Sequence, residues 1–254
     1  MLHHLPTENI LFLDIETVSA RAQFEELEEK WQHLWELKAQ FLRGRGEEDT
    51  PSSVYDRAGI FAEFGKIICI SVGFISGTSE QPGFRLKSFA GEDEKLLLTE
   101  FAGLLNTRYN ECYSRRDNPK GFLLCGHNGK EFDFPFIARR MLVHGIRLPK
   151  MLDVCGKKPW ETEHLLDTME MWKFGDFKSY TSLNLLAALF DIPTPKDDID
   201  GSMIYHTYWK EKDLARIVTY CQKDVLTVAQ LLRRYRGEPL IAENMVSFAK
   251  NGAV

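Results

Sequence analysis

The stretch Ile10-Leu11-Phe12-Leu13-Asp14-Ile15-Glu16-Thr17 decides the fold. Its apolar run ends in acidic residues and predicts a buried strand over Ile10–Ile15. Because side chains alternate along a strand, Asp14 and Glu16 should share one face, while Ile15 anchors the other face in the core. An isolated Asp-x-Glu also occurs where a strand runs out into solvent, and that interpretation stays open at this point.

The rest of the chain alternates between strand and helix signals. Apolar runs predict strands at 67–75, 84–89 and 121–125, with a weaker signal at 165–169. Helical periodicity is found at 92–106, 134–144, 182–190 and 213–234. Ser182 is a plausible N-cap, and Gly237 and Pro239 end the last helix. This order predicts one three-layer α/β domain over residues 1–254, with a central mixed sheet flanked by helices.

A helical insertion over about residues 20–55 interrupts the strand order. Apolar residues recur there at steps of three and four and predict an amphipathic helix from Ala20 to Leu42. The predicted apolar face comprises Phe24, Leu27, Trp31, Leu34, Leu37 and Phe41. We expect this helix, which also carries Trp35, to pack on its own sheet; contact with a partner or a second copy is the alternative.

Two further acidic motifs follow in the sequence. Asp133 comes after the strand at 121–125 and opens a helix, a position that favours carboxylates in any case. Tyr220 and Asp224 are four residues apart on a predicted helix and therefore share a face. Taken singly, each of these residues has an ordinary structural interpretation. Asp133 would be a first-turn acid, Tyr220 would pack at a helix interface and Asp224 would be solvated.

The three motifs together predict a metal site. Four converging carboxylates, Asp14, Glu16, Asp133 and Asp224, repel one another unless cations lie between them. Carboxylates beside apolar sequence are also costly without such compensation. A pair of divalent cations is the obvious compensator, and it indicates phosphodiester chemistry. Hard oxygen ligands suit Mg²⁺ or Mn²⁺, and the absence of a Cys/His sequence cluster disfavours zinc.

Composition narrows the class of protein. Hydrophobic residues make up 44% of the 254 residues, enough for a full core. The net charge of −5 argues against a passive nucleic-acid coat, although not against an enzyme that holds a few nucleotides. Five cysteines without C-x-x-C spacing predict free thiols, a reducing compartment and a cytoplasmic location. Neither a signal peptide nor a membrane span is predicted.

The ordered motifs resemble the Exo I, Exo II and Exo III motifs of the DEDD 3′–5′ exonuclease superfamily. Asp14 and Glu16 match Exo I, Asn128, Phe132 and Asp133 match Exo II, and Tyr220 and Asp224 match Exo III. Gly126-His127-Asn128 and Tyr220-Cys221 are most similar to the proofreading exonuclease domain of B-family DNA polymerases. The chain resembles a stand-alone bacterial relative of that domain, from about Asn9 to Arg236 without the insertion.

The resemblance implies a ribonuclease H-like fold and the DEDDy branch. The alternative branch has His where this chain has Thr219. The resemblance also implies two-metal-ion hydrolysis. Asp14 is implied to bridge both ions, Glu16 and Asp224 to bind the ion that carries the attacking water, and Asp133 to act on the other ion. Tyr220 is implied to orient or help to deprotonate that water. The expected products are nucleoside 5′-monophosphates released from the 3′ end.

Substrate contacts are predicted from residues near these motifs. Backbone groups of residues 15–18, including Ile15 and Thr17, are candidates for holding the terminal nucleotide, with Ile15 or Phe132 as a wedge. Asn128 offers an amide to backbone or substrate. Phe132 and Phe134 offer rings to a base, although core packing is as reasonable for one of them. Lys178 and Tyr180 lie in an aromatic loop that suits single strands, or they belong to an ordinary loop.

Several alternatives stay open at this stage. His127 is expected to be structural, and Asp167 either supports the sheet near the site or is solvated. DNA with single-stranded or frayed ends is the favoured substrate, and an RNA- or oligoribonucleotide-trimming enzyme has the same carboxylates. A non-catalytic nucleic-acid-binding adaptor is the alternative of another class. The sequence predicts no oligomeric state.

Overall fold

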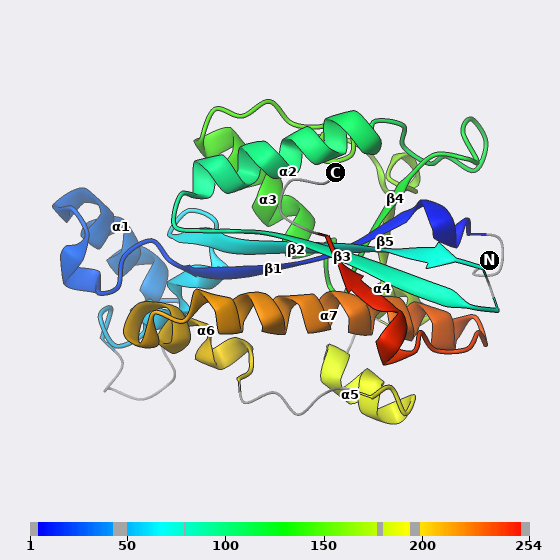
Figure 1. Ribbon diagram of the computed structural model, residues 1–254. Helices are drawn as coiled ribbons and strands as arrows, with labels where there is room; N and C mark the ends of the chain where they lie inside the picture. The colour runs from blue at the N-terminus through cyan, green and yellow to red at the C-terminus, as the bar shows by residue number, and fades with distance from the viewer. Residues whose placement is uncertain (1–4, 43–49, 79, 177–179, 194–198, 250–254) are drawn as a thin grey trace.

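A computed structural model describes residues 5–42, 50–78, 80–176, 180–193 and 199–249. Six strands form one sheet in the order β5-β4-β1-β2-β3-β6. Their bounds are β1 Ile10–Ser19, β2 Gly65–Gly77, β3 Pro82–Ala90, β4 Leu123–Gly126, β5 Leu165–Asp167 and β6 Val246–Phe248. Figure 1 shows α2 and α3 above the sheet and α5, α6 and α7 below it, so helices cover both faces.

Strand directions define the class of fold. The three long strands β1, β2 and β3 are consecutive and antiparallel, whereas β4 and β5 run parallel to β1 beside it. Three antiparallel strands continued by short parallel ones form the mixed sheet of a ribonuclease H-like fold. The predicted three-layer α/β architecture is therefore confirmed.

The alternation of side chains on β1 divides the core into two layers. Leu11, Leu13 and Ile15 pack in the cluster that contains residues of α2 and α3. Ile10 and Phe12 pack on the other face, in the cluster that contains Val225 and Val228 of α7. Asp14 and Glu16 lie on this second face, as the shared face predicted from the sequence requires, and both interact with residues of α7.

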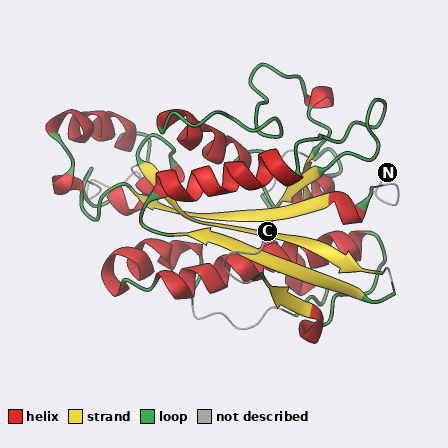
Figure 2. Cartoon of the chain, turned by 45° about the horizontal axis from the view of Figure 1, so that its top comes forward, coloured by secondary structure: helices red, strands yellow, loops and turns green. Residues whose placement is uncertain are grey.

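Seven α-helices lie among the described residues, together with shorter helical turns. Their bounds are α1 Glu29–Ala39, α2 Glu94–Arg108, α3 Asp133–Val143, α4 Thr168–Lys173, α5 Leu183–Leu189, α6 Ile204–His206 and α7 Leu214–Tyr235. The Ser182 side chain caps α5 by accepting a hydrogen bond from the Leu185 N–H, and Asp213 caps α7 in the same manner. The turns include η4, Tyr55–Ile60, and the π-helix η7, Thr207–Glu211. Figure 2 shows how these helices surround the strands.

The helix of the insertion differs from the prediction. It covers only Glu29–Ala39, and its buried residues are Trp35 and Ala39. The Trp35 ring packs on Tyr55 and Phe64 at centroid distances of 5.4 and 5.1 Å, and its indole N–H donates to the Pro51 carbonyl.

The predicted apolar face of this helix was wrong, because its residues are largely on the outside. Trp31 is 39% exposed, Leu37 47% and Phe41 87%. The helix has apolar residues on more than one of its sides, so the periodicity alone was compatible with two buried faces. The contact with η4, more than fifteen residues away in sequence, selected the face that contains Trp35.

One strand prediction is also corrected, and one strand was not predicted. The weak strand signal at 165–169 yields only Leu165–Asp167, because Asp167 caps α4 and turns the chain into that helix. The sequence predicted nothing after Pro239, yet β6 pairs parallel with β3 through Phe84, Arg85 and Leu86.

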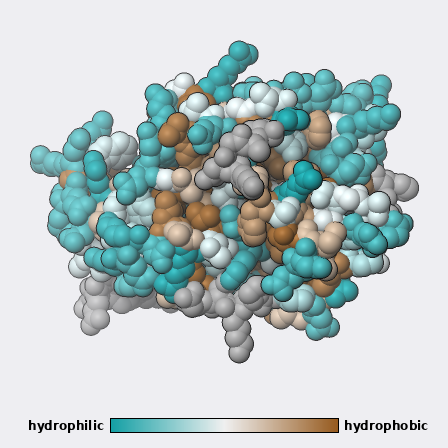
Figure 3. All heavy atoms as spheres, viewed as in Figure 1, coloured by the Kyte–Doolittle hydropathy of each residue, from teal (hydrophilic) through white to brown (hydrophobic). Residues whose placement is uncertain are grey.

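None of the helices that the structure describes has the length and apolar character of a membrane span. Figure 3 shows that hydrophilic side chains cover the periphery of one face of the molecule, while hydrophobic side chains gather near its middle.

Candidate active site

The first two carboxylates of the site come from β1. Asp14 and Glu16 are opposite Ser71 and Cys69 of β2, and the strand register shifts directly after Glu16. Ile15 points to the other face and is only 4% exposed, so the strand is anchored between its two acids. The period of two along the strand therefore places Asp14 and Glu16 side by side beneath α7.

The third carboxylate comes from the first residue of α3. Asp133 is buried, and its Oδ1 accepts a hydrogen bond from the Ile15 N–H at 3.1 Å. This hydrogen bond joins two motifs that are 118 residues apart in sequence. The helix N-terminus and the Ile15 N–H together hold the Asp133 carboxylate beside the β1 pair.

The helix α7 supplies the fourth carboxylate and its neighbours. Tyr220 and Asp224 are one turn apart and hydrogen-bonded to each other. Between them, the buried thiol of Cys221 donates to Asp14, with Sγ 3.3 Å from Oδ2 and 3.4 Å from the main-chain oxygen. The helix is thus fixed against β1 at the carboxylates.

Electrostatic effects show that these groups act on one another. Burial raises the pKa of Asp14 well above its usual value, and Glu16, Asp133 and Asp224 raise it further. Burial and then Asp224 raise the pKa of Glu16 in the same way. The pKa of Asp133 is raised to about 7, mainly by burial and despite its hydrogen bonds to main-chain N–H groups. The four carboxylates therefore form one mutually repelling cluster.

This cluster fits divalent cations. The carboxylate oxygens of Asp14 and Glu16 and the Cys221 sulfur all lie within 4.8 Å of one another. Burial and contact with Cys69 raise the Cys221 pKa well above its usual value, so the thiol stays protonated and donates to Asp14. The ligands left for a cation are carboxylate oxygens, which Mg²⁺ and Mn²⁺ prefer.

The sequence did not predict a role for Cys221 near the acids. Its spacing of four residues from Ile217 and from Val225 was the available signal, because it indicates the apolar face of the helix. The prediction that the cysteines are unbridged is confirmed for all five.

Tyr220 completes the site with a neutral phenol. Burial raises the pKa of Tyr220 far above its usual value, and Asp224, Glu16 and Asp14 raise it further. The adjacent Thr219, at the position where a His would define the other branch, is exposed.

Asp167 positions the loop that leads to Asp133, which answers the question that the sequence left open. This carboxylate is 3% exposed and lies at the end of β5. Its Oδ1 accepts from the Asn128 N–H at 3.0 Å and its Oδ2 from the Lys130 N–H at 3.1 Å. Oδ1 also accepts from the N–H groups of Met169 and Glu170 at the start of α4. The carboxylate therefore holds the Asn128 loop and α4 together.

His127 is structural, as predicted. Its two ring nitrogens lie 2.9 Å from the Thr168 hydroxyl and 2.9 Å from the Thr181 carbonyl. Burial lowers the pKa of His127, consistent with a neutral ring.

The predicted substrate contacts lie at different depths. The Ile15 side chain is in the core and its N–H donates to Asp133, so the predicted wedge role of Ile15 is wrong. The Thr17 hydroxyl donates to the Gly59 carbonyl. Phe132 packs partly against the core, 5.4 Å from the Phe136 ring, and Phe134 is fully a core residue. Asn128 has a left-handed backbone, and its buried amide oxygen has no partner among the described residues.

Tyr180 lies at the edge of the site. It is 69% exposed, and burial, Asp133 and Asp224 raise its pKa, which places the phenol within electrostatic reach of both carboxylates. Lys178, the other predicted contact in this loop, lies outside the described residues.

Fold and site define a class: a ribonuclease H-like α/β protein with a carboxylate cluster between β1, α3 and α7. Residues 61–237 match the family described as predicted 3′–5′ exonucleases related to the exonuclease domain of PolB. Because this match covers more than half of the chain, the protein belongs to that family of nucleases. Asp133, Tyr220 and Asp224 lie in the matched stretch, whereas Asp14 and Glu16 precede it.

Among solved structures, the chain is similar to the family B DNA polymerase from the hyperthermophilic archaeon Pyrobaculum calidifontis. The two share 17% sequence identity with a TM-score of 0.45, over 88% of this chain and 24% of the polymerase chain. The chain thus spans about a quarter of the length of that polymerase. No curated protein matches the chain in sequence.

Proposed function

We propose that this chain is a metal-dependent 3′–5′ exonuclease of the DEDDy type, acting as one domain over residues 1–254. The observation that carries the proposal is the convergence of four carboxylates from β1, α3 and α7, where burial and mutual repulsion raise the pKa values of Asp14, Glu16 and Asp133. Such a cluster is unfavourable by itself and becomes favourable when cations neutralise it. Membership of the exonuclease family supports the same reaction class.

Asp14, Glu16, Asp133 and Asp224 would hold two divalent cations, Mg²⁺ or Mn²⁺. When bound, these cations supply charge neutralisation at the scissile phosphate and an activated water. The protein contributes by holding these carboxylates in fixed positions. The Cys221 thiol fixes the Asp14 carboxylate, and the Ile15 N–H fixes that of Asp133.

Tyr220 orients the attacking water in this proposal. Its raised pKa means that the phenol keeps its proton, so it acts through a hydrogen bond and does not accept a proton from the water. Its partner Asp224, one turn away, keeps the hydroxyl directed at the carboxylate cluster.

The proposed substrate is single-stranded DNA or a frayed 3′ end, and the products are nucleoside 5′-monophosphates. A single strand suits the site because Phe132 is partly buried beside Asp133 and Tyr180 is exposed near it. Asn128 adds a buried amide oxygen for a sugar or base donor. We place the enzyme in the reducing cytoplasm, in agreement with its five free cysteines.

End-labelled single-stranded DNA, duplex DNA and RNA, each with Mg²⁺, with Mn²⁺ or with EDTA, test this proposal. We expect stepwise shortening from the 3′ end that requires the cation and is fastest on single-stranded DNA. Asp14→Asn and Asp224→Asn should remove activity, while Asp153→Asn on the exposed surface should not. Faster shortening of RNA would reassign the substrate. No shortening of any substrate with either cation would favour a non-catalytic adaptor.

A further inference from the structure

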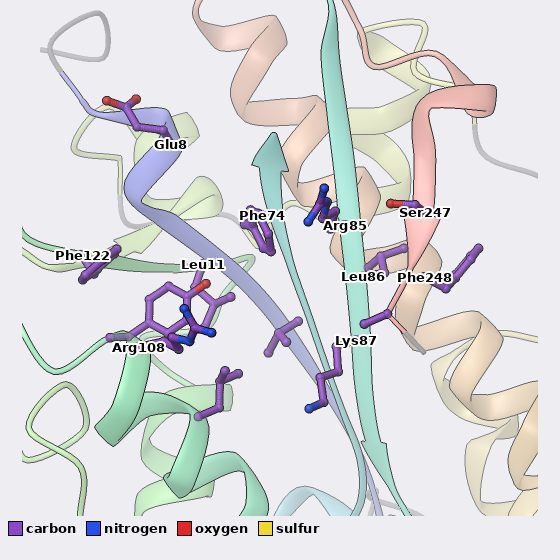
Figure 4. A pocket seen from close by; sticks show the side chains of 14 residues that line it. Glu8, Leu11, Phe74, Arg85, Leu86, Lys87, Arg108, Phe122, Ser247 and Phe248 are labelled. Atoms are coloured by element: carbon purple, nitrogen blue, oxygen red, sulfur yellow. The ribbon is translucent and has the colours of Figure 1, made fainter. Parts of the chain in front are cut away.

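A cavity lies on the face of the sheet opposite the carboxylates. Its volume is about 760 Å³, within the range of about 300–1,000 Å³ typical of small-molecule sites. It is bounded by β1, β2 and β3, the end of α2, and the segment that contains β6 (Figure 4). Leu11 lines it, and Leu11 belongs to the core layer under α2, whereas Asp14 and Glu16 face α7.

The cavity is positively charged in a protein of net charge −5. Three cations line it, Arg85, Lys87 and Arg108, against one acid, Glu8. Figure 4 shows Arg85 and Lys87 leaving β3 on the side of Leu11 and Arg108. Neither Arg85 nor Lys87 forms an ion pair with any residue in the described ranges, and Arg85 is exposed. The charge of this cavity therefore favours the binding of an anionic ligand.

The floor and walls of the cavity are apolar and aromatic. Leu11 and Val72 are buried beneath it, and Phe74 is half-buried opposite Arg85 in the strand register. Tyr109 and Phe122 form an edge-to-face pair with centroids 5.0 Å apart. A flat ring that carries a negative group matches this combination, because aromatic side chains stack on bases and cations pair with phosphate.

We propose that this cavity binds a nucleotide unit, a base with its phosphate, at a site separate from the carboxylate cluster. The base packs between Phe74 and the aromatic pair, and the phosphate pairs with Arg85 and Lys87. Leu11 and Glu16 are five residues apart, about 17 Å along β1 and on opposite faces, so one nucleotide cannot occupy both sites. The unit is either a free nucleoside monophosphate or part of a longer strand.

Isothermal titration calorimetry in EDTA tests the proposal without any hydrolysis. The probes are deoxyadenosine 5′-monophosphate, deoxyadenosine and a short single-stranded oligodeoxyadenylate. Arg85→Glu with Lys87→Glu removes the phosphate contacts. Lys30→Glu with Lys95→Glu makes the same change of net charge at exposed sites on α1 and the far end of α2. Phe74→Leu keeps an apolar side chain but removes the ring.

We expect the monophosphate or the strand to bind the wild-type protein and the Lys30/Lys95 variant equally. Binding should weaken at least about tenfold in the Arg85/Lys87 variant, and also as salt rises from about 50 to about 200 mM. Phe74→Leu should weaken it about fivefold or more through lost stacking. Binding of the monophosphate identifies a free nucleotide as the ligand, and binding of the oligonucleotide alone identifies a strand.

Three results would overturn the proposal. These are equal affinity in the Arg85/Lys87 and Lys30/Lys95 variants, equal affinity for deoxyadenosine and its monophosphate, and absence of binding by both phosphorylated probes. Because the measurement needs neither metal nor catalysis, its failure is distinct from failure of the proposed exonuclease activity.

Discussion

Replacement of Asp133 by Asn should stabilise the metal-free protein while it impairs the reaction. The Asp133 pKa is about 7 in the folded protein and 3.8 ordinarily. Between these values the folded state binds more protons than the unfolded state, so the free energy of unfolding falls as pH rises. At about 1.4 kcal/mol per pH unit, the ionised Asp133 costs about 4 kcal/mol once the pH exceeds its folded pKa.

The Asp133→Asn variant would keep much of the local geometry. The new amide oxygen can still accept from the Ile15 N–H, the contact that measures 3.1 Å in the wild-type protein. The lost carboxylate at the helix N-terminus costs about 0.3–1 kcal/mol, which leaves a net gain of about 3 kcal/mol at alkaline pH. Below about pH 4, where the wild-type carboxyl is neutral in both states, the gain should disappear.

Urea unfolding in EDTA from about pH 5 to about pH 8 is the assay, with Asp153→Asn as the surface control. The wild-type protein should lose stability across this range, and Asp133→Asn should lose less. Addition of Mn²⁺ should restore stability to the wild-type protein more than to the variant, because only the complete cluster binds the cations tightly. A variant that is less stable than wild type at pH 8 without metal would refute the reasoning.

Substitutions at three further residues test the positions of single groups. Tyr220→Phe should lower kcat by about 10²-fold with little change in KM, measured on single-stranded DNA; an unchanged kcat would remove Tyr220 from the reaction. Cys221→Ser should retain most activity because a hydroxyl still donates to Asp14. Cys221→Val should lose about 1 kcal/mol of transition-state stabilisation, which would be measured as a several-fold lower kcat. Equal rates for the two variants would contradict the positioning role of Cys221. Asp167→Ala should lower the free energy of unfolding by about 2–4 kcal/mol in urea titrations because four N–H groups lose their acceptor, and a loss below about 1 kcal/mol would contradict the assignment.

The sequence was most informative where the structure depends on local geometry. The shared face of Asp14 and Glu16 follows from the period of a strand, and the shared face of Tyr220 and Asp224 from the turn of a helix. The Ser182 cap follows from its hydrogen-bonding side chain. These features require no knowledge of the rest of the chain.

Contacts between distant segments could not be predicted in this way. Asp167 accepts hydrogen bonds from residues 37 and 39 positions away, and the sequence contains no periodic signal for such a contact. The buried face of α1 was decided by packing of Trp35 on Tyr55. The thiol of Cys221 meets Asp14 across 207 residues, so its role emerges only when the helix lies on the sheet.

The separation of the motifs along the chain also has a consequence for biosynthesis. The Asp133–Ile15 hydrogen bond spans 118 residues, and the Cys221–Asp14 contact spans 207. During synthesis, β1 leaves the ribosome before α3 and α7, so Asp14 and Glu16 initially lack the residues that these helices supply. Contacts of such long sequence separation form slowly because the intervening loop must close first. A nascent chain should therefore be unable to cut nucleic acid until α7 has emerged and docked.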